Sequence, residues 1–136
     1  IHVHANGTGA VLHLTDNTSG SGTGEGFDII SHAGSAYLWQ RENANMIFGT
    51  QGTSRWNIYG SNGHLAPSAN ATYDIGSSSM RVRNIYTNDL NLSNEGSKND
   101  VDGTWGNYTI QEGESDLFLI NKRNGKKYKF NLTEVS

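Results

Sequence analysis

The sequence contains no cysteine and a single proline among its 136 residues. Without cysteine the chain cannot form a disulfide, a thiolate metal site or a cysteine nucleophile, so packing alone must stabilise its fold. Long apolar runs are missing too: none approaches the roughly 18 residues of a membrane-spanning helix, and no basic segment followed by an apolar one opens the chain. We therefore expect a soluble protein without membrane insertion.

Hydrophobic residues are scarce. They make up 34% of the chain, beside 17 glycines, and the mean hydropathy is -0.61. One chain with so few apolar side chains has little material for a core, yet its β-branched and aromatic residues are too regularly spaced for a disordered chain. A hydrophobic core shared between several copies would resolve this shortage.

The net charge of -3 at pH 7 argues against nucleic-acid binding, which usually needs a basic face. The positive charges are nevertheless unevenly distributed, because five of the ten basic residues lie close together. They are Lys122, Arg123, Lys126, Lys127 and Lys129. We interpret this cluster as the solvated tip of a hairpin, with contact to a polyanion as the alternative.

Apolar and polar residues alternate along short segments that end in Gly or Asn, a pattern typical of β-strands. The segments are 1–5, 10–14, 27–31, 36–41, 45–49 and 55–59. A stretch without periodicity, 16–26, predicts a surface loop. No apolar stripe with helical spacing persists for three turns, so the sequence predicts almost no helix. We expect an all-β fold whose first part, residues 1–66, is an antiparallel sandwich or jelly-roll-like unit.

The second part is expected to cover residues 67–136, with Pro67 at the junction. In it Met80–Thr87 alternates like a strand, with two arginines on one face and Asp74 as a plausible partner for them. A C-terminal hairpin is predicted from Asp116–Asn121 and Lys126–Leu132, which flank a two-residue turn at Asn124-Gly125. Such a turn would bring Leu119 or Ile120 near Tyr128 and Phe130.

Enzymatic chemistry finds little support. The paired carboxylates Glu112 and Glu114, and Asp100 and Asp102, lie in glycine-containing stretches typical of solvated turns, whereas a glycosidase pair needs an enclosed cleft. No nucleophile elbow or H-E-x-x-H motif occurs. We therefore expect no enzyme activity, no catalytic residue and no cofactor in this chain.

Four aromatic residues are candidates for binding a ligand: Tyr37, Trp39, Trp56 and Tyr59. Their ring faces would suit the C–H groups of a sugar. Packing in a core or at a subunit interface is the alternative, and we favour it over sugar binding.

A motif found in the C-terminal regions of phage tail-fibre and tailspike proteins resembles three stretches of this sequence. They are Leu65-Ala66-Pro67, then Tyr73-Asp74-Ile75-Gly76-Ser77-Ser78-Ser79, then Arg81 with Arg83-Asn84-Ile85-Tyr86. Residues 41–63 are similar to a strand repeat of the same fibres. The tail from Trp105 to Phe130 is similar to the end of the neck appendage proteins of phi29-like Bacillus phages. Together the resemblances cover about the last two thirds of the chain.

This resemblance implies a homotrimer with strands intertwined after Pro67, located in the virion after assembly in the host cytoplasm. It implies a receptor-binding tip that attaches the virion to a cell-wall polymer, such as teichoic acid, with the basic cluster as one contact. A C-terminal intramolecular chaperone would be removed by self-cleavage after Ser136, although an arbitrary chain end would look the same. A structural trimerisation shaft and a carbohydrate-degrading domain are the alternative functions.

The segment His2-Val3-His4 places two imidazoles on one face of an expected strand. Three copies around a threefold axis would supply six nitrogen ligands for a divalent metal, an arrangement that resembles metal sites in some long phage fibres. Two exposed histidines without a metal are the more ordinary interpretation, so we predict no metal site.

Overall fold

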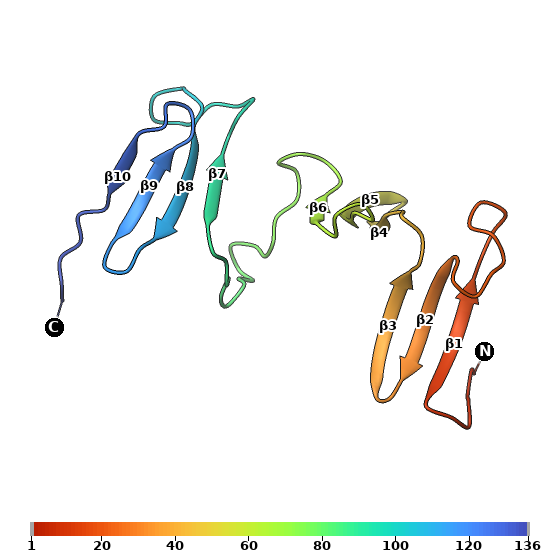
Figure 1. The fold of residues 1–136 in the computed structure, drawn as a ribbon. Coiled ribbons are helices and arrows are strands. Elements are labelled where there is room, and N and C mark those ends of the chain that lie inside the picture. Colours follow the sequence, from red (N-terminus) through yellow and green to blue (C-terminus); the bar gives the residue numbers. More distant parts are fainter. Residues whose placement is uncertain (1, 136) are drawn as a thin grey trace. The chain divides into compact units, whose positions relative to one another are not determined.

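The computed structural model describes residues 2–135, which form an all-β fold with antiparallel sheets and no helix (Figure 1). Ten strands are present in these residues. They are β1 (Gly9–Leu14), β2 (Phe27–His32), β3 (Ser35–Gln40), β4 (Met46–Thr50), β5 (Thr53–Ile58), β6 (Leu65–Pro67), β7 (Leu90–Ser93), β8 (Asn107–Glu112), β9 (Leu117–Asn121) and β10 (Lys127–Lys129). Nothing in the described chain qualifies as a membrane-spanning helix.

The first sheet, in the order β1-β2-β3, has two different faces. Residues directly opposite one another share a face and successive residues alternate, so the register assigns each side chain. One face, here called the aliphatic face, carries Ala10, Leu12, Leu14, Phe27, Ile29, Ser31, Ala36, Leu38 and Gln40. The other, here called the aromatic face, carries Gly9, Val11, His13, Asp28, Ile30, His32, Ser35, Tyr37 and Trp39.

The second sheet, in the order β4-β5-β6, is also apolar on one face. That face carries Met46, Phe48, Trp56, Ile58, Leu65 and Pro67. The strands β4 and β5 are joined by Gln51-Gly52 and the strands β2 and β3 by Ala33-Gly34, and all four turn residues have positive φ. These are the two-residue turns whose twist matches that of the flanking strands.

The third sheet, in the order β10-β9-β8-β7, collects the C-terminal strands. One face carries Leu90, Leu92, Tyr108, Ile110, Leu117, Leu119 and Tyr128. The opposite face is more polar, and there the fully buried Thr109 hydroxyl donates to Asn91 Oδ1 over 2.7 Å. The sheet is therefore amphipathic, with one side suited to packing on another apolar surface.

None of the three sheets has a covered core within the described chain. Among residues 2–135 no hydrophobic side chain is buried, and the buried polar ones are Asp28, Asn57, Thr109 and Asn121. The large apolar side chains on all three sheets stay partly exposed. The strands are thus held by backbone ladders and polar contacts rather than by an interior.

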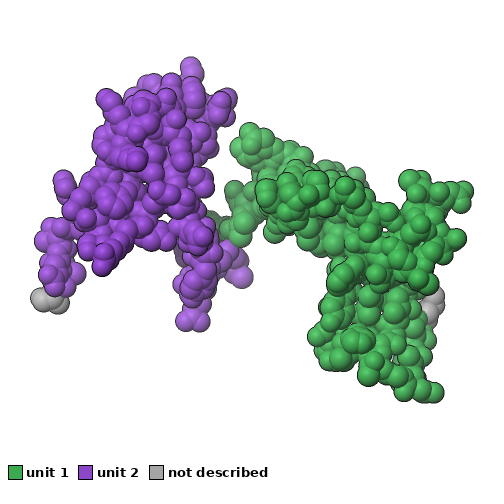
Figure 2. Space-filling view, in the orientation of Figure 1, with its two compact units in different colours: residues 1–79 green, residues 80–136 purple. Residues whose placement is uncertain are grey.

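The chain divides into two compact units, 1–79 and 80–136 (Figure 2). The division lies beyond Pro67, which is the last residue of β6 and pairs with Trp56. Residues after Pro67 remain with the first unit because Tyr73 contacts β5: the Arg55 guanidinium lies 5.2 Å from the Tyr73 ring centroid and donates to its hydroxyl over 3.1 Å.

Several strand predictions are confirmed and others are wrong. Strands occur at 10–14 and in the four segments between 27 and 59, but residues 2–5 are not a strand. Met80–Thr87 is not a strand either, because no strand of the described chain pairs with it, and Asp74 forms no ion pair within residues 2–135. The strands β6, β7 and β8 were not predicted.

The C-terminal hairpin is confirmed, with a longer loop than expected. Leu119 lies opposite Tyr128, so the predicted proximity of these two residues is confirmed. A two-residue turn would pair Arg123 with Lys126, whereas the loop closes through hydrogen bonds from Gly125 N to Asn121 O and from Asn121 N to Lys126 O. The observed register, with Ile120 opposite Lys127, differs from the expected one by two residues. An even shift keeps every side chain on its expected face.

Candidate functional site

Two of the four candidate aromatic residues lie together on the aromatic face. Tyr37 and Trp39 are separated by one residue of β3, and their ring centroids are 6.0 Å apart with an interplanar angle of 55°. The guanidinium of Arg41, just beyond the strand, lies 5.9 Å from the Trp39 ring. Trp39 remains 49% exposed, so its ring is held in place while much of it stays accessible.

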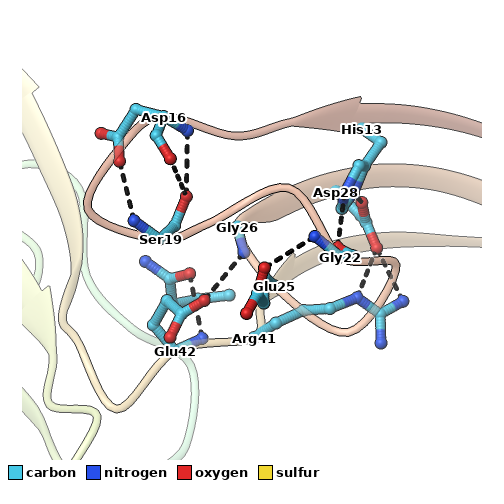
Figure 3. Close-up of polar contacts among 10 residues, drawn as sticks. His13, Asp16, Ser19, Gly22, Glu25, Gly26, Asp28, Arg41 and Glu42 are labelled. Atoms are coloured by element: carbon cyan, nitrogen blue, oxygen red, sulfur yellow. Dashed lines mark hydrogen bonds and ion pairs between the residues drawn. The ribbon is translucent and has the colours of Figure 1, made fainter.

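A buried carboxylate anchors this face (Figure 3). Asp28 has 1% of its surface exposed, and both of its oxygens are occupied. His13 Nδ1 donates to Oδ1 over 2.5 Å, while Arg41 donates to Oδ2 from Nε over 2.7 Å and from an Nη over 2.6 Å. A charge this buried is tolerated only when paired and fully hydrogen-bonded, as it is here.

The partners of Asp28 also set its protonation. The hydrogen bond from His13 lowers the pKa of the Asp28 carboxyl from its ordinary value, burial opposes this change, and the hydrogen bond and charge of Arg41 reinforce it. Asp28 is therefore ionised at neutral pH, and its charge fixes the Arg41 side chain beside Trp39.

The loop from Asp16 to Gly26 is closed by polar contacts next to this cluster (Figure 3). Its backbone amides donate to nearby carboxylates: Gly22 N to Glu25 over 2.6 Å and Gly26 N to Glu42 over 2.9 Å. The ring of His13 also reaches this loop, with its Nε2 lying 3.2 Å from Gly22 O. At Gly26 a side chain would not fit, because a Cβ would stand 2.2 Å from Leu14 O.

The aromatic face contains a shallow hollow of about 280 Å³, lined by Ile30, His32, Tyr37, Trp39 and Arg41. Most of its lining is apolar, with an imidazole and a guanidinium as the hydrogen-bonding groups. This combination of ring faces and a few fixed polar groups is typical of small-ligand sites.

The other two candidate aromatic residues lie on the second sheet. Trp56 lines a cleft of about 470 Å³ together with Phe48, Thr50, Arg55, Tyr73 and Asp74, whereas Tyr59 is not among its lining residues. The donors of Arg55 are used locally, by Thr50 Oγ1 at 3.2 Å and by the Tyr73 hydroxyl at 3.1 Å. The structure thus places Tyr37 and Trp39 together, whereas Trp56 lines a separate cleft without Tyr59, so the four residues do not form one platform.

The basic cluster lies around the C-terminal hairpin, and two of its members are engaged. Arg123 lies 3.9 Å from the Trp105 ring centroid and donates to Trp105 O over 2.7 Å. Lys129 forms an ion pair with Asp116 at 2.7 Å. For Lys122, Lys126 and Lys127, all exposed, the described chain shows no acidic partner.

The remaining candidates show no assembled site. His2 and His4 are exposed with ring centroids 6.0 Å apart, and no group of three or more metal-ligating side chains occurs within residues 2–135. Asp102 serves its own loop: it accepts hydrogen bonds from Thr104 and Asn99, which lower the pKa of its carboxyl. Ser136 lies outside the described residues.

Sequence reasoning missed the residues that organise the aromatic face: His13, Asp28 and Arg41. One signal was present, since an aspartate between Phe27 and Ile29 within an apolar strand must find partners if it is buried. The identity of those partners depends on the register of three strands, which no local pattern gives.

Comparisons with protein-family models, with curated proteins and with solved structures give no match to this chain.

Proposed function

We propose that this chain is the distal receptor-binding part of a homotrimeric phage appendage of the tailspike or tail-fibre kind. The observation that carries the proposal is the combination of well-formed strands with no buried hydrophobic side chain in residues 2–135. Ordering a backbone costs roughly 1–2 kcal/mol per residue, and hydrophobic burial is the main term that offsets this cost. A lone chain lacks that term, so other copies must supply it.

The three apolar sheet faces are the surfaces for this association. Burying a large aliphatic or aromatic side chain contributes about 1.5–3 kcal/mol. Leu38 on the aliphatic face is 56% exposed and Leu65 on the apolar face of the second sheet is 60% exposed, so much of this energy is unused in one chain. Packing such faces across a threefold axis would create sandwich-like interiors between subunits.

The segment Arg81–Thr87 supports intertwining. It makes no backbone-backbone hydrogen bond within the described chain, although its side chains alternate like those of a strand. Ile85 is 75% exposed and Tyr86 is 92% exposed. Both features suit a segment that pairs with strands of neighbouring copies. The resemblance to phage fibre motifs covers these same residues.

The receptor in this proposal is a polymer of the host cell wall. Lys122, Lys126 and Lys127 would contact a polyanion such as teichoic acid through charge-assisted hydrogen bonds, with Arg123 fixed against Trp105. Many trimers on one virion would turn weak single contacts into firm capture. The chain would function in the virion.

A structural shaft that trimerises without touching a receptor is the second candidate, because the same uncovered faces favour it. Two measurements separate the candidates. Light scattering should give three times the chain mass of 14.8 kDa, and labelled trimers should decorate susceptible bacterial cells. Trimers that decorate no cells would leave only the shaft, and a compact folded monomer would refute both.

A further inference from the structure

We infer that the aromatic face of the β1-β2-β3 sheet binds a pyranose sugar in the hollow between Tyr37, Trp39, His32 and Arg41. This inference deepens the proposed function, on which it rests, by assigning a ligand class and a site to the receptor-binding part. It concerns residues remote in sequence from the basic hairpin, so the two contacts can be tested separately.

The two faces of this sheet are built for different partners. The aliphatic face carries no charged side chain and consists mainly of Leu, Ile, Ala and Phe residues, which suits burial against another copy. The aromatic face carries His13, Asp28 and His32, with Arg41 beside it, and burying these groups against an apolar surface would be costly. We therefore assign the aliphatic face to the trimer and the aromatic face to the ligand.

The Arg41 guanidinium of the site is fixed before any ligand arrives. Asp28 holds Arg41 through two nitrogens, and His13 holds Asp28 from the other side. The guanidinium has five N–H donors in a rigid fork, so it retains donors beyond those bound to Asp28. Such preorganisation reduces the entropy lost on binding.

The hollow matches a sugar ring in size and chemistry. Its volume of about 280 Å³ lies near the lower end of small-ligand sites, which fits one saccharide unit rather than a long segment. The exposed ring of Trp39 and the half-buried ring of Tyr37 offer faces to the ring C–H groups, as aromatic side chains do for apolar surfaces. Arg41 and His32 then lie at the rim to bind hydroxyl groups or a carboxylate of the sugar.

The rival cleft on the second sheet is less suited. Phe48 and Trp56 also supply rings there, but Arg55 is held by two neutral hydroxyl groups, those of Thr50 and Tyr73, rather than by a buried carboxylate. That cleft therefore has the aromatic surface with a less firmly fixed guanidinium. It therefore serves as the internal comparison.

The test uses the whole chain and an array of defined neutral and uronic-acid-containing bacterial surface glycans. The variants are Trp39→Leu and Tyr37→Leu, with Phe48→Leu, 43% exposed, as the matched control. We expect at least one glycan to bind, with affinity about tenfold weaker in Trp39→Leu, as is usual for removal of a central aromatic anchor, and unchanged in Phe48→Leu. Thermal melting verifies that each variant is folded, and Tyr37→Leu covers the case in which Trp39→Leu is not.

The outcomes separate this site from the proposed function when cell decoration is measured in parallel. Glycan binding lost through Trp39 or Tyr37 supports the site, even if no cell is decorated, in which case only the proposed function fails. Equal glycan binding by the native chain and by both variants overturns the site, and cells that are still decorated then leave the proposed function intact. The site is also overturned if no glycan binds, or if glycan binding is lost only in Phe48→Leu.

Discussion

The hairpin β9-β10 and the segment Met80–Thr87 differ in the hydrogen bonds that their backbone N–H and C=O groups form. Both alternate apolar and polar side chains, but β10 lies opposite β9 in register, whereas Arg81–Thr87 makes no backbone-backbone hydrogen bond within the described chain. The hairpin partners are joined by a short loop, so pairing costs little chain entropy. Alternation therefore marks a segment that is able to form a strand, and the presence of a nearby partner decides whether one chain forms it.

The largest expected effect tests whether other copies of the chain supply a strand that pairs with Met80–Thr87. We predict that Ile85→Asp abolishes the trimer and destabilises the fold by about 3–5 kcal/mol, because an unpaired charge would be buried between subunits. Val101→Asp is the control, since Val101 is 96% exposed in a loop and should tolerate charge. Light scattering and thermal melting measure both. Equal behaviour of the two variants would contradict a role for Ile85 in assembly.

A second prediction concerns β2, where the side chain of Asp28 is bound by His13 and Arg41. Because the pKa of Asp28 is held below its ordinary value of 3.8, its stabilising contribution is complete above that pH and is lost as the pH falls through the lower, folded value. The melting temperature should therefore decrease when the pH is lowered below about 4. This decrease should be smaller in Asp28→Asn, which is already destabilised at neutral pH.

Asp102→Asn is the comparison for Asp28, because hydrogen bonds lower the pKa of Asp102 too, but within one exposed loop. Asp102→Asn should lower the melting temperature less than Asp28→Asn does. An acid transition that is identical in the native chain and in Asp28→Asn would show that the cluster on the aromatic face does not couple to folding.

The sequence predicts elements whose partners are close along the chain. The strands β1 to β5 and the C-terminal hairpin were predicted, because alternation and the intervening loops are local signals. The strands β6 and β7 were missed because three and four residues are too short for alternation to stand out, and β8 was missed because Tyr108 and Ile110 are its only apolar residues. For Met80–Thr87 the alternation was seen correctly, but the strand inferred from it does not form in one chain.

The candidate site shows the same limit. Tyr37 and Trp39 were selected from the sequence because their spacing of two places both rings on one face of a strand. Their separation from Trp56 and Tyr59, and the clustering of His13, Asp28 and Arg41 beside them, depend on register between strands. Register follows from the pairing of whole segments and has no signature in single residues.

A third prediction sharpens the role of the hairpin loop. Gly125 has a φ of 73° and open space around it, so Gly125→Ala is penalised by conformation alone, at about 1–2 kcal/mol. Gly7→Ala is the control, because Gly7 also has open space but is not among the positive-φ residues. Denaturant unfolding compares the two. A cost as large at Gly7 would mean that the loop conformation is not what stabilises the hairpin.

The smallest expected effect concerns the open end of the same hairpin, where Lys129 pairs with Asp116 at 2.7 Å. Both side chains are partly exposed, so Lys129→Gln should cost only about 0.2–1 kcal/mol, and the cost should vanish near 1 M salt because screening removes it. Lys127→Gln, on the same strand and without an acidic partner in the described chain, should change stability less. If both variants lose the same stability, or if the loss persists in high salt, then packing of the lysine stems rather than the ion pair closes this end of the hairpin.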